Sequence, residues 1–135
     1  METLKAPATL LARLLLSLLF IVAGFGKLSD PAGAAGYMAH LGIPTILLYP
    51  TILLELGGGL AILFGVLTRP VSLALAAFCV LTALLAHLHP GDAGNMINFW
   101  KNLGLTGGFF LLAIQGAGAL SVDAKLNGTS QLQRA

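Results

Sequence analysis

Four long apolar runs are the feature that most constrains this chain. They cover residues 8–28, 45–67, 70–88 and 98–120 of a sequence of 135 residues. A helix needs about 20 apolar residues to cross a bilayer, and each run approaches or exceeds that length. Charged residues make up only 9% of the chain, whereas soluble domains carry about 25%. The sequence therefore predicts an all-α, polytopic membrane four-helix bundle.

The distribution of charge predicts how the four helices are oriented. We expect one transmembrane domain over residues 1–122 and a polar C-terminal tail over residues 123–135. Four crossings place both ends of the chain on one side, together with the turn between the second and third helices. That side has more basic residues than the other, which favours cytoplasmic N and C termini. The cytoplasmic set is Lys5, Arg13, Arg69, Lys125 and Arg134, and the opposite set is Lys27 and Lys101.

Residues 29–44 form the longest connection between the apolar runs. Asp30-Pro31 is typical of a helix start, because proline is favoured at the first helical position. Tyr37, Met38 and Leu41 would then share one side of the helix. This pattern predicts a short interfacial helix between the first and second transmembrane helices.

Glu55 is an isolated carboxylate near the middle of the second run. A charge at that depth costs at least ~2.5 kcal/mol on insertion scales, so such residues usually face the bundle interior and have a partner. Arg13 is the first candidate partner, because its long side chain can form forked pairs with carboxylates. Lys101, which enters from the opposite side, is the second. We expect a buried ion pair of Glu55 with Arg13 or Lys101, and a purely structural role for it stays an alternative.

Polar side chains gather at the predicted non-cytoplasmic ends of the helices. A positively biased pocket with apolar walls would suit a quinone or another lipid-soluble carbonyl compound, because Lys and His can donate hydrogen bonds to its oxygens. A quinone is accordingly the expected ligand, without a covalently bound cofactor. Trp100 and Lys27 also have simpler interpretations as anchors at the headgroups. The predicted pocket residues are Lys27, Glu55, His87, Asn98, Trp100 and Lys101.

Several kinds of chemistry find little support in the sequence. Cys79 is the only cysteine, so the chain cannot form an intrachain disulfide or a Cys-x-x-Cys redox pair. His87 and His89 are two residues apart and would point to different faces of a helix, so no metal site is predicted. No flavin or haem motif is recognisable, and no catalytic residue can be assigned. A net charge of +2 is too small to indicate nucleic-acid binding.

The order and spacing of several short motifs resemble the DoxX family of small bacterial four-helix membrane proteins. The resemblance runs from Leu10 to about Asp123 and implies a bacterial inner (cytoplasmic) membrane protein. Some relatives resemble subunits of thiosulfate:quinone oxidoreductase, and others are linked to membrane complexes that handle thiol or oxidative stress. The family's recurring charged positions correspond to Arg13, Lys27, Glu55, Arg69 and Lys101. The matching pieces are Arg13-Leu14-Leu15, Gly24-Phe25-Gly26-Lys27-Leu28, Leu41-Gly42-Ile43-Pro44, Glu55-Leu56-Gly57-Gly58-Gly59, Gly65-Val66-Leu67-Thr68-Arg69, His87, and Asn98-Phe99-Trp100-Lys101-Asn102-Leu103.

Two functions from different classes are compatible with these residues. The first is a quinone-interacting or membrane-anchoring subunit of an oxidoreductase complex, which requires a redox partner subunit. The second is non-enzymatic, either a membrane scaffold or a small-solute permease-like bundle with a structural ion pair. Glycines at Gly57-Gly58-Gly59, Gly104 and Gly108 suit packing within one chain or between copies, so a homo-oligomer is compatible with the sequence. The lipid bilayer is the partner that both functions share.

Overall fold

The computed structural model describes residues 2–132 and, within that range, contains helices and loops but no strand. The all-α prediction is therefore confirmed for this part of the chain. The structure divides the helical segments more finely than the sequence suggests, with two π-helical turns and one short 3-10 helix. The elements are α1 (Glu2–Ser29), α2 (Pro31–His40), η1 (Thr45–Leu47), α3 (Leu48–Ile52), η2 (Leu53–Gly57), α4 (Gly58–Phe64), α5 (Thr68–Thr82), η3 (Ala83–His87), α6 (Ala93–Gln115) and α7 (Val122–Leu132).

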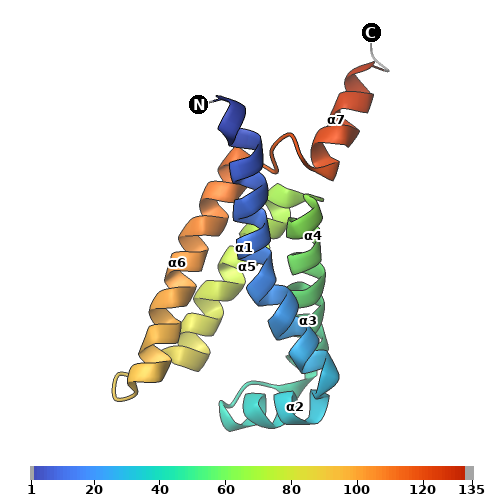
Figure 1. The fold of residues 1–135 in the computed structure, drawn as a ribbon. Helices are drawn as coiled ribbons and strands as arrows, with labels where there is room; N and C mark the ends of the chain where they lie inside the picture. Colours follow the sequence, from blue (N-terminus) through green and yellow to red (C-terminus); the bar gives the residue numbers. More distant parts are fainter. Residues whose placement is uncertain (1, 133–135) are drawn as a thin grey trace.

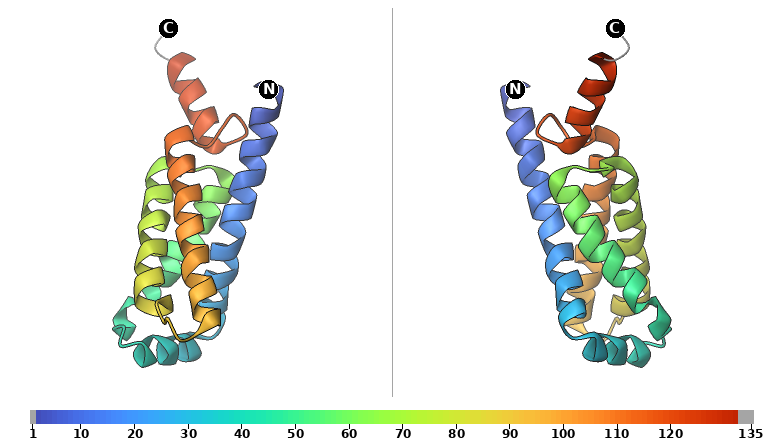
Figure 2. Two further views of the ribbon diagram at one scale, coloured as in Figure 1. Left: turned by 90° about the vertical axis from the view of Figure 1, so that its left-hand side faces the viewer. Right: turned by 90° about the vertical axis from the view of Figure 1, so that its right-hand side faces the viewer.

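Two antiparallel hairpins make up the bundle. In the first, α1 packs against the column formed by α3, η2 and α4, and in the second, α5 and η3 pack against α6. Figure 2 shows these columns side by side from two directions. The hairpins are joined by the tight turn between α4 and α5 and diverge towards α2, which crosses the wide end (Figure 1). The molecule is therefore closed at the end that carries both termini and wider at the other.

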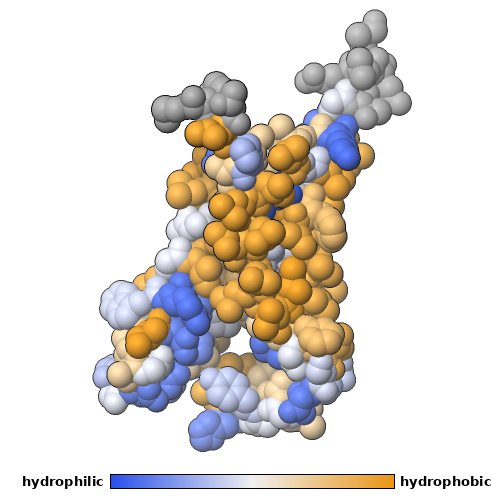
Figure 3. Space-filling model, viewed as in Figure 1, coloured by the Kyte–Doolittle hydropathy of each residue, from blue (hydrophilic) through white to orange (hydrophobic). Residues whose placement is uncertain are grey.

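The outer surface of the bundle is apolar. In the described part of the chain, three helical stretches are long and apolar enough to cross a membrane, namely Leu4–Ser29, Thr45–Phe64 and Thr68–His87. α6 has 23 residues, but its first half carries Asn and Lys side chains and is more polar. Figure 3 shows a broad apolar surface over α1 and the column beside it, with hydrophilic residues towards the α2 end. Lipid contact requires such an exterior, because polar groups have no hydrogen-bond partner in the bilayer core.

Glycines bring the two columns of the first hairpin into close contact. A Cβ at Gly24 would lie 2.6 Å from the backbone nitrogen of Leu56, and one at Gly59 would lie 2.9 Å from Cγ1 of Ile21. Neither position has room for a side chain. Small residues at such points are the usual way in which membrane helices approach one another. The Gly24–Leu56 contact fixes the register of α1 against η2, and with it the neighbours of Glu55.

The second and fourth predicted helices differ in their bounds from the observed ones. In place of one helix over residues 45–67, a 3-10 turn, α3, η2 and α4 follow one another, and α4 ends where Gly65 adopts a left-handed φ of 69°. In place of a helix over residues 98–120, α6 begins at Ala93 and ends at Gln115. Gly116 and Gly118 follow with φ of 84° and 76° and turn the chain away from the helix axis.

Two π-helical turns, η2 and η3, lie in different hairpins. Turns of this kind are rare inserts in α-helices and often occur at functional sites. η2 contains Glu55, and η3 ends with His87. The sequence gives no sign of them, because both segments have the composition of an ordinary apolar helix.

An apolar core holds the two hairpins together. Phe20 of α1 and Phe109 of α6 meet edge to face, with their ring centroids 5.3 Å apart. A smaller cluster of Met38, Leu48 and Ile52 fixes α2 to α3. α2 is therefore anchored to the first hairpin. The other buried members of the main core are Ile62, Leu75, Ala76, Cys79 and Leu112.

Arg13 connects three segments at the closed end of the bundle. Its side chain is almost completely buried, with 1% of the residue exposed. Nη1 donates hydrogen bonds to the carbonyl oxygens of Ala117 and Leu120, at 2.7 and 2.9 Å, and Nη2 donates to that of Leu63 at 2.8 Å. Carbonyls at helix ends and in loops have no intrahelical donor. Arg13 therefore ties α1 to the last turn of α4 and to the loop after α6.

The C-terminal segment, expected to be only a polar tail, forms the helix α7 (Figure 1). Residues 133–135, including Arg134, lie outside the described part of the chain. The Asp123 carboxylate accepts hydrogen bonds from the backbone N–H groups of Leu67 and Thr68, both at 2.9 Å, where α5 begins. Asp123 thus caps α5 from a distant part of the sequence, which a local capping pattern could not predict.

Replacing Asp123 with Ala should remove this cap and lower the free energy of unfolding by ~1 kcal/mol. Partial burial alone would raise the pKa of Asp123, but hydrogen bonds from Thr68 and Leu67 and the nearby charge of Arg13 hold it below its ordinary value. A carboxylate with a lowered pKa stabilises the fold above its unfolded pKa, and this contribution is lost as the pH falls through the folded pKa.

The Tm of the wild type and of Asp123→Ala should be compared by thermal unfolding in detergent, from neutral pH into the acid range. We expect the difference between them to be largest at neutral pH and to shrink as the pH falls. A difference that stays constant over this range would contradict a role for the Asp123 charge.

Candidate functional site

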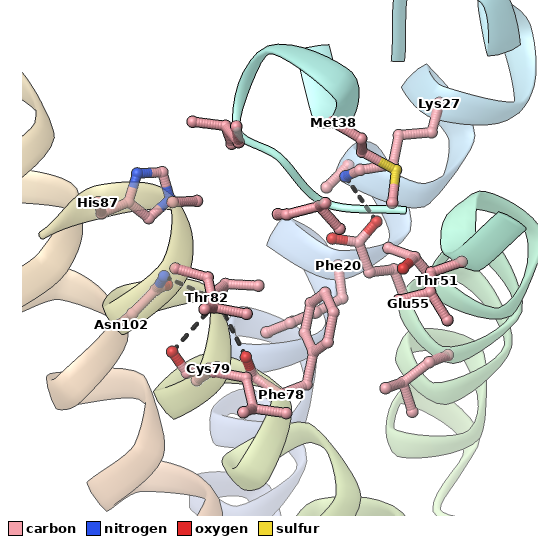
Figure 4. A pocket seen from close by; sticks show the side chains of 18 of the residues that line it. Phe20, Lys27, Met38, Thr51, Glu55, Phe78, Cys79, Thr82, His87 and Asn102 are labelled. Carbon is pink, nitrogen blue, oxygen red and sulfur yellow. Dashed lines mark hydrogen bonds and ion pairs between the residues drawn. The ribbon is translucent and has the colours of Figure 1, made fainter. Parts of the chain in front are cut away.

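A cavity of about 460 Å³ lies between the two hairpins, near α2. Its volume is within the range of about 300–1,000 Å³ that small-molecule sites usually have. Most of its lining is apolar. Figure 4 shows Lys27 and Glu55 on one side of the cavity and Thr82, His87 and Asn102 on the other. Its polar lining residues include Lys27, Thr51, Glu55, Thr82, His87, Lys101 and Asn102.

Lys27 and Glu55 form an ion pair on the cavity wall. The Lys27 Nζ and Glu55 Oε2 atoms are 2.7 Å apart, and the Lys27 side chain is 29% exposed while Glu55 is 5% exposed. The close contact of Gly24 with Leu56 explains the pair. Because α1 and η2 run antiparallel, Lys27 lies ~4.5 Å and Glu55 ~1.5 Å from that contact in the same direction, a difference that a long lysine side chain can span. The packing of the first hairpin therefore brings Lys27 beside Glu55.

The predicted pairing of Glu55 with Arg13 or Lys101 is wrong. Arg13 precedes Lys27 by about 21 Å along α1, and its guanidinium is bonded to carbonyl groups at the closed end. Lys101 lines the cavity, but its Nζ donates to Asn98 Oδ1 at 2.8 Å. The sequence interpretation relied on the long side chain of Arg13 and on the side from which Lys101 enters. The glycine contact sets the register instead, and it favours Lys27.

A short chain of hydrogen bonds orients His87. Asn95 donates through Nδ2 to Asp92 Oδ2 at 2.9 Å, which leaves Asn95 Oδ1 as the acceptor for His87 Nδ1 at 3.4 Å. Hydrogen bonds from the backbone and side chain of Asn95 also hold the pKa of Asp92 below its ordinary value. In the tautomer in which Nδ1 donates to Asn95, Nε2 can accept a hydrogen bond. The cavity thus combines an ammonium donor with an imidazole acceptor.

Thr82 and Asn102 form a polar part of the cavity wall that the sequence interpretation missed. Asn102 donates through Nδ2 to the Thr82 hydroxyl at 3.1 Å, and that hydroxyl donates to the carbonyl oxygen of Phe78 at 3.0 Å. Both residues belong to the second hairpin, so this bond stabilises the contact of α5 with α6. A polar pair at helical spacing, Asn102 and Thr106, was the available signal, because both positions face the same side of an apolar helix.

Asn98 and Trp100 are not among the residues that line the cavity. Trp100 is 63% exposed and packs edge to face against Phe99, with the ring centroids 5.0 Å apart. This position is typical of an aromatic residue at the membrane interface. The predicted pocket residues that do line the cavity are Lys27, Glu55, His87 and Lys101.

A second and more polar hollow, of about 700 Å³, adjoins the cavity. We call it the outer vestibule. It shares Tyr37, Leu41, Leu85 and Ala86 with the cavity, so the two are contiguous. Among residues 2–132, no three His, Cys, Asp or Glu side chains are grouped so that they could hold a metal ion. The vestibule is lined by Tyr37, His40, Leu41, Leu85, Ala86, His89, Pro90, Gly91, Asp92 and Asn95.

Over residues 2–132, a helical fold with an apolar exterior, three helices of membrane length and a charged pair beside an internal cavity are the features of a small integral membrane protein. The chain belongs to the DoxX family, whose family model matches residues 8–88. This range includes most of α1 and all of η2 and η3, and therefore Lys27, Glu55 and His87. The resemblance noted in the sequence is thus confirmed.

Three curated relatives extend this comparison. The chain is 50% identical to "Inner membrane protein YqjF" of Escherichia coli K12 over 127 residues, which cover 94% of this chain and 98% of that protein. It is 40% identical to "Inner membrane protein YphA" of the same organism over 123 residues, 86% of this chain and 88% of the relative. "Putative oxidoreductase CatD" of Bacillus subtilis is 28% identical over 109 residues, 76% and 81% of the two chains. No solved structure gives a significant match.

Removing one member of the Lys27–Glu55 pair should destabilise the protein more than removing both. A charge left without its partner at this depth costs on the order of 1–3 kcal/mol. We therefore expect Lys27→Met and Glu55→Gln each to lower the Tm in detergent, and the double variant to recover part of the loss.

Lys101→Met is the matched control, because Lys101 contacts Asn98 and not Glu55. Its Tm should stay close to that of the wild type. If both single variants of the pair unfold at the wild-type temperature, the ion pair does not stabilise the fold.

Proposed function

We propose that the chain is a multi-pass protein of the bacterial inner membrane whose four helical columns all cross the bilayer. The relatives YqjF and YphA are named inner membrane proteins. The excess of Lys and Arg near the end that carries the termini supports a cytoplasmic location for both. In this orientation α2 lies at the opposite interface, where it covers the wide end of the bundle, and the cavity lies within the outer half of the membrane.

The cavity, in this proposal, binds a lipid-soluble carbonyl compound, and a quinone fits it best. The observation that carries the proposal is the placement of Lys27 and His87 on different walls of a largely apolar cavity. A quinone ring has carbonyl oxygens at its two ends, which become hydroxyl groups on reduction. The Lys27 ammonium can donate to a carbonyl, and neutral Nε2 of His87 can accept from a hydroxyl. The two side chains together therefore suit the oxidised and the reduced form.

The corresponding cellular role is that of a membrane subunit in an oxidoreductase complex. The relative named "Putative oxidoreductase CatD" supports this class of function. A partner subunit would supply the electrons that reduce the quinone, and this chain would hold the quinone ring and anchor the complex. The Lys27–Glu55 pair would keep a cation beside the ring, where negative charge develops as electrons arrive.

The contact between the cavity and the outer vestibule favours a second candidate, a permease-like bundle for a small solute. The vestibule provides polar side chains from the outer face to the cavity that holds Glu55. Such a function would make the Lys27–Glu55 pair a barrier on the solute path. Uptake of a small polar solute into proteoliposomes, absent from protein-free vesicles, would support this function over the first.

Quinone binding should depend on His87. His87→Leu should weaken the binding of a benzoquinone with a decyl tail by about tenfold, which corresponds to ~1.4 kcal/mol and to one hydrogen bond. His89→Leu is the matched control, since His89 lines the vestibule and not the cavity. Binding should be measured by equilibrium dialysis in detergent, corrected for partition into micelles.

A photoreactive azidoquinone provides an independent readout of the site. Its cross-links should map by mass spectrometry to η2 and η3 and should decrease in the presence of unlabelled quinone. Quenching of Trp100 fluorescence would be a poor substitute, because Trp100 lies outside the cavity lining. Labelling that does not saturate, or equal binding by His87→Leu and the wild type, would contradict the proposed site.

A further inference from the structure

The cavity has an opening between α1 and α6. The two helices touch at Leu16 and Gly108, where a Cβ on the glycine would lie 3.2 Å from Leu16 Cδ2. Gly104 lies one turn nearer the α2 end, on the same face of α6, and a Cβ there would meet no atom within 4 Å. Figure 3 shows a hollow in the surface between the ends of these helices, above α2. α1 and α6 therefore separate below their contact and leave the cavity accessible from the side.

Two residues along this opening are small. Ala23 of α1 lines the cavity, and Gly104 of α6 stands beside open space. Phe20 and Phe109 close the opening towards the core. Lys27 and Lys101 lie on either side of it near α2. A slim apolar chain would fit between the helices here, with cationic side chains near the polar end of its path.

The other ways out of the cavity are less suitable for an apolar chain. The outer vestibule carries His40, His89, Asp92 and Asn95, and an alkyl chain there would meet polar groups and water. Between η2 and η3 the lining is formed by the bulky side chains of Leu54, Phe78, Leu81 and Leu85, whereas Gly104 beside the α1–α6 opening has no side chain. The α1–α6 opening combines free space with an apolar surround at the depth of the bilayer.

We infer that the ligand of this cavity is a single-tailed amphiphile that enters sideways from the bilayer. Its polar ring lies between Lys27 and His87, and its tail leaves the cavity between α1 and α6 past Ala23 and Gly104. The inference rests on the proposed quinone function. It adds that the ligand carries an apolar tail, and it specifies the route by which the ligand enters the cavity. Gly104 is then a specificity-determining position, because the absence of a side chain there keeps the tail path open.

Two ligands separate the tail from the ring in the test of this inference. One is a benzoquinone with a decyl tail, and the other is the same ring with a methyl group in place of the tail. Gly104→Trp should weaken the binding of the decyl compound by about tenfold or more and leave the methyl compound within about twofold. Gly104→Leu, a smaller blocking variant, should show the same selectivity to a lesser degree and provides the test if the Trp variant does not fold. Leu103→Trp places the same side chain at an exposed neighbouring position of α6 and should leave both affinities unchanged.

The possible results distinguish the inference from the function on which it rests. Equal affinity of Gly104→Trp and the wild type for the decyl compound would overturn the tail path while leaving ring binding intact. Equal loss for both compounds would place Gly104 at the ring site and would also overturn it. Failure of the wild-type protein to bind either compound would overturn the proposed function, and the tail assignment with it.

Discussion

The close approach of α1 to η2 at Gly24 is the contact on which the rest of the site depends. With no side chain at Gly24, the backbone of Leu56 can lie against α1, and the two columns lock in one register. That register places Lys27 beside Glu55, so a carboxylate that would be costly in a bilayer gains a cation 2.7 Å away. The charged pair is therefore a consequence of backbone packing, and it does not require long-range electrostatic attraction between distant helices.

Polar groups at the two ends of the bundle have different tasks. At the closed end, Arg13 and Asp123 satisfy backbone carbonyl and N–H groups where helices begin and end. At the wide end, Lys27, Glu55 and His87 stand beside a cavity, and two π-helical turns supply two of these side chains. The apolar core around Phe20 and Phe109 separates the two groups. One end is thus held by hydrogen bonds, and the other contains a cavity.

The sequence predicts the helical class and the main helices well, because apolar runs and turn residues are local signals. It also places Lys27, His87 and Lys101 in one cavity because they lie near the same helix ends, and Glu55 with them because a carboxylate in an apolar helix is expected to face the interior. It fails on the partner of Glu55, since the register of two helices depends on which glycines touch, and several glycines were available. It also misses the Asp123 cap, whose partners are more than fifty residues away in the chain, and the π-helical turns, for which composition carries no signal.

Each hairpin consists of helices that are neighbours in sequence, whereas the cavity lies at the seam between the hairpins. Contacts within a hairpin therefore close short loops, at a low cost in chain entropy. Contacts between the two hairpins close much longer loops. The Lys27–Glu55 pair belongs to the first kind and the cavity itself to the second. During biogenesis, the charge on Glu55 would thus be neutralised as soon as the first hairpin is inserted, before the cavity exists. Glu55 would therefore not face lipid as an unpaired carboxylate before the second hairpin is inserted.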